Sequence, residues 1–116
     1  MRRGDVILIN HPFSHASGAK VRPVLVVSGD RDNRRLGSVI VATITGTIRR
    51  AAEPTQLLIE LASPEGAASG LHRTSCVVCN NLFSVDSVKI RNHLGRLPGP
   101  VMVRVNACLK AALDLP

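Results

Sequence analysis

An arginine stands directly before a proline at the start of an apolar run, in the stretch "KVRPVLVV". Pro23 fixes its own φ angle and pushes the preceding residue towards an extended conformation, so Arg22 should leave a stiff strand entrance rather than a loop. A guanidinium held in this way presents a fork of donors that matches a phosphate. The alternative is a surface arginine that caps the edge of a sheet or forms an ion pair.

A second polar side chain stands where another apolar run stops. Thr45 ends the run "VIVATIT" at residues 39–45, and Gly46 opens a loop. We therefore expect the Thr45 hydroxyl at the rim of a groove. Thr43 should point the same way along the strand, whereas Ala42 and Ile44 share the other face. Threonine is also common in strands simply because its shape suits them, so a purely structural role stays open.

Cations and histidines in the loops are further candidates. Arg49 and Arg50 follow Thr45 in a basic loop, which beside a groove would steer a polyanion. His15 in the first long loop and His72 before the fifth predicted strand can each accept a proton near pH 7. Lone loop histidines more often have no catalytic role, and His15 is the one we keep as a candidate.

The charge of the chain favours a polyanionic partner. Among 116 residues, 15 are lysine or arginine and 8 are aspartate or glutamate, which gives a formal net charge of +7 at pH 7. Nucleic acid is the first candidate partner, and a domain that is merely basic is the alternative. With no Trp or Tyr and only Phe13 and Phe83, the chain is unsuited to stacking bases on exposed rings, so RNA contacts would rely on charge, amides and hydroxyls.

Several catalytic motifs are missing from the sequence. It has no glycine-rich phosphate loop, no paired carboxylates at metal-ligand spacing and no nucleophile elbow. These absences argue against nucleotide hydrolysis and metal catalysis, and we expect neither a metal nor a cofactor. Cys76 and Cys79 have C-x-x-C spacing, but residues three apart in a strand point to opposite faces. Together with Cys108, they are interpreted as buried structural thiols rather than a zinc or redox site.

The sequence also lacks the features of membrane and secreted proteins. Its apolar runs reach about four residues, against the roughly 20 that cross a bilayer. The first five residues lack the apolar core of a signal peptide. The default expectation is therefore a cytoplasmic protein without a membrane partner.

Five short β-type segments, joined by loops rather than crossover helices, predict a curled, mostly antiparallel sheet or small barrel. Their expected bounds are Val6 to Ile9, Val21 to Ser28, Ser38 to Ile44, Gln56 to Leu61, and Ser75 to Asn80. The connection at 29–37 has room for a single helical turn, and 62–74 is expected to be a loop of small residues. We expect one α+β domain over residues 1–116.

Helical spacing replaces strand alternation near the C-terminus. Asp86 is placed to cap a short helix from Ser87 to His93, which Gly95 would stop. A longer helix should then cover one mouth of the sheet, because apolar residues recur at helical spacing: Val101, Val105, Cys108, Leu109, Ala112 and Leu113.

Taken in order, several fragments make the sequence resemble the MazF/PemK family of toxin endoribonucleases. These are "RGDVILI", "VRPVLVVS", "VIVATIT", "SGLHRTSCVV", "FSVD" and "HLGRLP". The resemblance implies a small SH3-like barrel with a C-terminal helix and a homodimer that cuts single-stranded RNA at short sequences without a metal. It also implies products with 2′,3′-cyclic phosphate and 5′-hydroxyl ends, and a partner antitoxin with an acidic, disordered tail.

The resemblance places the catalytic pair of the family on Arg22 and Thr45. We further expect RNA contacts around His15, Lys20, Arg49, Arg50 and Asn80. Many relatives carry an acidic residue, often followed by glutamine, where this chain has Asn80 and Asn81, and asparagine cannot accept a proton as a carboxylate does. Either another group such as His15 takes the proton, or the requirement for a base is weak, or this chain is slow.

Two other functions remain open from the sequence. A non-catalytic barrel of the same fold would bind RNA or, like CcdB, inhibit DNA gyrase through its C-terminal helix, although the tail "ALDLP" lacks the tryptophan such an inhibitor uses. A basic barrel that recognises a protein ranks last.

Overall fold

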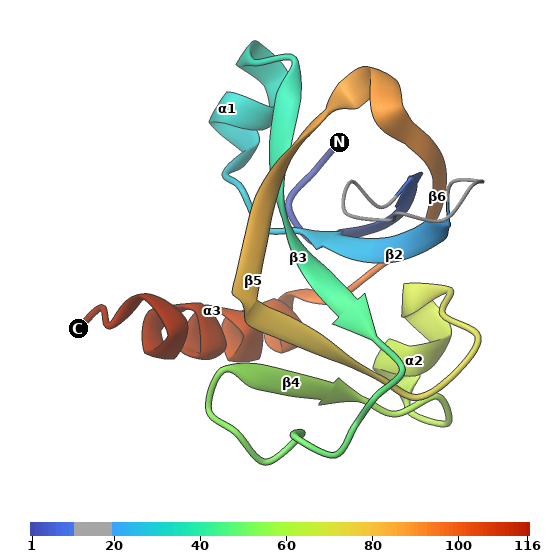
Figure 1. Cartoon of the computed structure of the whole chain (residues 1–116), viewed down its shortest axis with the longest axis vertical. Coiled ribbons are helices and arrows are strands. Elements are labelled where there is room, and N and C mark those ends of the chain that lie inside the picture. Colours follow the sequence, from blue (N-terminus) through green and yellow to red (C-terminus); the bar gives the residue numbers. More distant parts are fainter. Residues whose placement is uncertain (11–19) are drawn as a thin grey trace.

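The computed structural model describes residues 1–10 and 20–116, and within them six strands form one antiparallel sheet in the order β4-β5-β3-β2-β1-β6 (Figure 1). The candidate residue His15 lies outside these residues. The strands are β1 (Asp5–Asn10), β2 (Val21–Val26), β3 (Ser38–Thr45), β4 (Gln56–Ile59), β5 (Ser75–Asp86) and β6 (Ile90–Arg96). The helices are α1 (Asp30–Arg35), α2 (Pro64–Ser69), a 3-10 turn η1 (Ser87–Lys89) and α3 (Gly99–Leu113).

Both faces of the sheet bury aliphatic side chains, because neighbouring residues of a strand point to opposite sides. On one face, Val6, Leu25 and Ala42 belong to the cluster that also contains the buried residues of α3. On the other, Ile7 and Val24 belong to a second cluster, formed by β1, β2, β3 and the far end of β5. A sheet that buries both of its faces in a chain this short must curl.

The predicted C-terminal helix is confirmed as α3. Its buried side chains Val101, Met102, Val105 and Cys108 lie along one face of the helix and pack into the first cluster. The helix lies across one side of the sheet, beside β5 and β4 (Figure 1). None of the helices in the described part of the chain has the length and hydropathy that crossing a membrane requires.

The prediction of a helix from Ser87 to His93 is wrong. Only η1 is helical there, and the following residues form β6, which pairs with β1 through contacts such as Ile7 with His93. Asp86 makes no side-chain cap. Pairing along the free edge of β1 satisfies the backbone groups of a whole strand, which outweighs the weak local preference for a helical turn.

The segment 62–74 is not the plain loop that we predicted, because it contains α2. Ser63 caps this helix by accepting a hydrogen bond from the Gly66 N–H at 3.0 Å, Pro64 opens the first turn, and Gly70 ends the helix at φ 73°. By contrast, the helical turn expected within 29–37 is confirmed as α1.

Strand β5 runs well past its predicted end at Asn80. Its register against β3 shifts between Ala42 and Thr43, which leaves residues 79–81 as a bulge where the strand bends. In the described residues the edge strands β4 and β6 do not pair with each other, so the antiparallel sheet with a C-terminal helix is confirmed and closure into an SH3-like barrel stays a prediction.

Candidate active site

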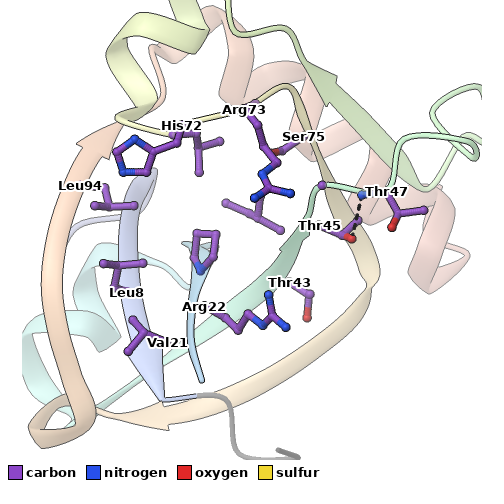
Figure 2. A pocket seen from close by; sticks show the side chains of 14 residues that line it. Leu8, Val21, Arg22, Thr43, Thr45, Thr47, His72, Arg73, Ser75 and Leu94 are labelled. Atoms are coloured by element: carbon purple, nitrogen blue, oxygen red, sulfur yellow. Dashed lines mark hydrogen bonds between the residues drawn. The ribbon is translucent and has the colours of Figure 1, made fainter. Parts of the chain in front are cut away.

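A cavity of about 630 Å³ opens where β2 begins and β3 ends (Figure 2). Its walls come from these strands, from β1 and β6, and from the segment that leads from α2 into β5. The lining residues are Leu8, Val21, Arg22, Pro23, Thr43, Ile44, Thr45, Gly46, Thr47, Leu71, His72, Arg73, Ser75 and Leu94. The described lining is thus apolar in one part and rich in hydroxyls and cations in another, and it contains no carboxylate.

The start of β2 is held on one side only. Arg22 pairs with Ile9 of β1, and Pro23 with Leu8, but the pairing of β2 with β3 begins only at Val24 and Thr43. The proline lacks an N–H, so it is best tolerated where a strand has no ladder partner. Beyond the last pair, the two strand ends carry Arg22 and Thr45 to the same cavity.

Arg22 is exposed to solvent. Within residues 1–10 and 20–116, no carboxylate forms an ion pair with it and no hydrogen bond occupies its guanidinium. The side chain extends from β2 towards the part of β3 that carries Thr43 (Figure 2). Among the described residues, the ion-paired alternative is therefore not observed, and the donors of the fork are available to a ligand.

The Thr45 hydroxyl has one fixed contact. Its oxygen accepts a hydrogen bond from the Thr47 N–H at 3.1 Å, which orients the side chain and leaves the hydroxyl proton free to be donated. Thr43 also lines the cavity, whereas Ala42 belongs to the core cluster on the opposite face, as the strand alternation predicted. Ile44 has a place in both, as a buried core residue that also forms part of the cavity wall.

The other predicted RNA contacts that the structure describes do not line the cavity. Lys20 is exposed just before β2, and Asn80 is exposed on the bulge of β5. Arg49 and Arg50 are exposed in the turn that follows β3, where Arg50 lies 3.8 Å from Glu53. These residues flank the strands that form the site. Of the predicted residues within 1–10 and 20–116, Arg22 and Thr45 are the two that line it together.

His72, which the sequence suggested only as a proton acceptor, and Arg73, which no sequence pattern singled out, also line the cavity. Both are exposed and precede β5. The Arg73 side chain crosses Gly46: a Cβ placed on that glycine would lie 2.8 Å from Arg73 Cδ. The available signal was an adjacent histidine and arginine, one residue before β5. The guanidinium groups of Arg22 and Arg73 make the cavity a site of positive potential, where anions concentrate.

The cysteines are buried, as predicted. Burial, together with the adjacent Cys108, raises the pKa of the Cys79 thiol to about 12. In the described residues, no three histidine, cysteine or acidic side chains are grouped so that they could hold a metal ion.

The chain is similar to proteins of known families. A family model for the PemK-like, MazF-like toxin of type II toxin-antitoxin systems matches residues 2–113. The endoribonuclease MazF of Staphylococcus saprophyticus is 31% identical over 116 residues, which cover 99% of this chain and 92% of that protein.

Solved structures share the fold. A mycobacterial endoribonuclease in complex with its cognate antitoxin has a TM-score of 0.79 at 24% identity, covering 100% of this chain and 97% of that one. A MazE–MazF structure from Deinococcus radiodurans has a TM-score of 0.74 at 20% identity, covering 100% and 98%. Because the family model spans almost the whole sequence, the chain belongs to the PemK-like, MazF-like toxins of type II toxin–antitoxin systems.

Proposed function

We propose that this endoribonuclease of the MazF/PemK family cleaves single-stranded RNA in the cavity at the ends of β2 and β3, with Arg22 and Thr45 acting on the scissile phosphate. One observation carries the assignment. Two side chains with free donors, projecting from adjacent strands, line one cavity whose described walls hold no carboxylate. Such a site suits a group that is already anionic and becomes more so during reaction.

The reaction that fits these donors is an internal transfer. The ribose 2′-oxygen attacks the neighbouring phosphorus, an O2′–P bond forms, and the P–O5′ bond breaks. Negative charge builds on the nonbridging oxygens, where the Arg22 guanidinium and the Thr45 hydroxyl act as aimed donors. The products are a 2′,3′-cyclic phosphate and a 5′-hydroxyl, and no step needs a metal ion.

Two protons must move in this reaction. The 2′-hydroxyl loses one, and the leaving 5′-oxygen gains one. Arginine stays protonated at any useful pH, so Arg22 is a poor base, but it can donate to the leaving oxygen. Asn80 cannot accept the first proton. Among the described cavity residues, His72 carries the one imidazole, and it or water takes that proton.

The same positive cavity suggests how the toxin is silenced. Solved relatives include complexes with antitoxins, from mycobacteria and from Deinococcus radiodurans. We propose that this chain is a cytoplasmic homodimer, and that its cognate antitoxin carries an acidic, disordered segment. Aspartates and glutamates in such a segment would compete with RNA for the cationic surface.

Cleavage of end-labelled RNA in EDTA tests the proposal. Wild type should cut at short, defined sequences and leave cyclic-phosphate ends, whereas Arg22→Ala and Thr45→Ala should lower the rate by about 10²- to 10³-fold, as expected when an aimed transition-state donor is removed. Unchanged rates in both variants would remove the assignment. Since the family match already favours RNA over gyrase, a supercoiling assay with gyrase should show no inhibition.

A further inference from the structure

A second arginine approaches the cavity from the side away from β2. Arg73 lies in the segment between α2 and β5, and its guanidinium points into the cavity (Figure 2). Its backbone is held in place, because the Ser75 hydroxyl donates a hydrogen bond to the Arg73 carbonyl at 2.9 Å. The cavity therefore has two guanidinium groups, carried by separate elements of the fold.

The Arg73 side chain lies across the backbone that follows Thr45. A Cβ on Gly46 would meet Arg73 Cδ at 2.8 Å, Nη1 at 3.3 Å and Nε at 3.6 Å. Gly46 does not have the positive φ that favours glycine, so its backbone conformation would accept other residues. The missing Cβ leaves space beside Gly46, and the Arg73 side chain occupies that space. The glycine thus lets the Arg73 stem lie close to the backbone that follows Thr45.

The Arg73 guanidinium is available for a ligand. No carboxylate in residues 1–10 and 20–116 forms an ion pair with it, and the described cavity lining contains no acidic side chain that would. An arginine whose only role was to keep the surface soluble would not need a glycine beneath its aliphatic stem at the end of β3. A guanidinium at one wall of a positively charged cavity has the planar set of donors that binds a phosphate.

We propose that Arg73 is a second phosphate-binding residue, which holds the RNA phosphate next to the scissile one, and that Gly46 is glycine because it must seat Arg73. The inference rests on the proposed function of the cavity. RNA is a chain of regularly spaced phosphates, so a site that binds two neighbours fixes the path of the strand across the cavity. Arg22 then meets the phosphate that reacts, and the apolar wall near Leu71 and Leu94 receives the sugar or base between them.

The test separates binding from cleavage. Cut sites are first mapped on a long RNA, and a short single-stranded RNA spanning one site is made with a 2′-deoxyribose at the attacked position, so that it binds but cannot react. Its dissociation constant is measured against salt for wild type, Arg73→Ala, Arg73→Lys, Gly46→Ala and the Gly46→Ala/Arg73→Ala double variant. Arg31→Ala, which removes an exposed arginine on α1, is the matched control.

Arg73→Ala should weaken binding about tenfold and reduce the salt slope by about 0.7, the value of one phosphate contact on a single strand. Arg73→Lys should keep the slope and recover part of the affinity, because it keeps the charge but loses the fork. Gly46→Ala should weaken binding when Arg73 is present and have no further effect in Arg73→Ala. On the all-ribose RNA, the KM of Arg73→Ala should rise by more than its kcat falls. Arg31→Ala should match wild type.

An Arg73→Ala variant with wild-type affinity and salt slope overturns the inference, as do Gly46 and Arg73 effects that simply add. These outcomes differ from failure of the proposed function. If Arg22→Ala loses cleavage while Arg73→Ala binds normally, only the second phosphate site is wrong. If Arg22→Ala and Thr45→Ala both keep full activity, the reaction lies elsewhere. Thermal midpoints within a few degrees of wild type show that each variant is folded.

Discussion

Arg22 and Thr45 reach one cavity from two strands that stop pairing just before them. The β2–β3 ladder ends at Val24 and Thr43, and two further residues along each strand bring the guanidinium and the hydroxyl to the same opening. The backbone of both residues is held at the ends of a rigid sheet, and the Thr45 hydroxyl is oriented by the Thr47 N–H before a ligand arrives. Preorganised donors of this kind lose little free energy to rearrangement when charge develops on a bound phosphate.

The hydroxyl of Thr45, rather than its shape, should matter for cleavage. Thr45→Val keeps the branched side chain but removes the donor, so it should lower kcat by about 10²- to 10³-fold. Thr45→Ser retains the oxygen that accepts from the Thr47 N–H and should stay within about tenfold of wild type. Single-turnover cleavage in EDTA measures both. Equal rates for the valine and serine variants would assign Thr45 a packing role only.

Asp5 should contribute stability that is lost in acid. This carboxylate is nearly buried and accepts hydrogen bonds from the Arg2 N–H at 2.8 Å and from Arg96 Nη1 at 2.9 Å, with His93 Nε2 at 3.3 Å. Burial alone would raise the pKa of Asp5, but these contacts together outweigh burial and hold the pKa below its ordinary value. A lowered pKa in the folded state means that the stabilisation is complete above the unfolded value of about 3.9 and disappears as the pH falls through the folded value.

The variant Asp5→Asn should therefore be less stable at pH 7 by about 1.5–3 kcal/mol, the usual worth of a hydrogen bond to a charged group. The difference in free energy of unfolding between this variant and wild type should shrink as the pH is lowered from 5 towards 2. Urea denaturation at a series of pH values measures this. Asp32→Asn, at an exposed pair with Arg35, should change the free energy of unfolding by about 0–1 kcal/mol throughout. A constant gap between Asp5→Asn and wild type across this range would contradict the argument.

Features that depend on neighbouring residues in the chain could be predicted from the sequence, whereas features that depend on distant contacts could not. Arg22 and Thr45 stand at strand ends that proline, glycine and apolar runs mark within a few residues, and the α3 spacing is equally local. The strand β6 could not be found in this way, because residues 90–96 are extended only by pairing with β1, far away in the chain. Arg73 belongs to the cavity because its side chain rests on Gly46, a contact between two loops that no local pattern encodes.

Close packing of α2 against β6 makes Gly95 a sensitive position. A Cβ there would meet the Ala68 carbonyl oxygen and lie 2.6 Å from the Ser69 carbonyl carbon, and both are backbone atoms that cannot turn aside. Gly95→Ala must push α2 away from β6 and should lower the free energy of unfolding by about 1–3 kcal/mol. Gly37→Ala is the matched control, because its Cβ would have no neighbour within 4 Å. Urea midpoints that are equal for the two variants would show that α2 yields freely.

The thiols of Cys79 and Cys108 should be inert while the protein is folded. A thiol reacts as its thiolate, and with the pKa of Cys79 at about 12 the thiolate fraction at pH 8 is about 10³-fold or more below that of an ordinary cysteine. Burial also blocks access to Cys76, the third thiol. Titration with a chromogenic disulfide at pH 8 should label native protein slowly, at the rate at which it unfolds, and label all three cysteines at once in urea. A thiol that reacts within seconds in the native protein would contradict this and reopen the redox interpretation of the C-x-x-C pair.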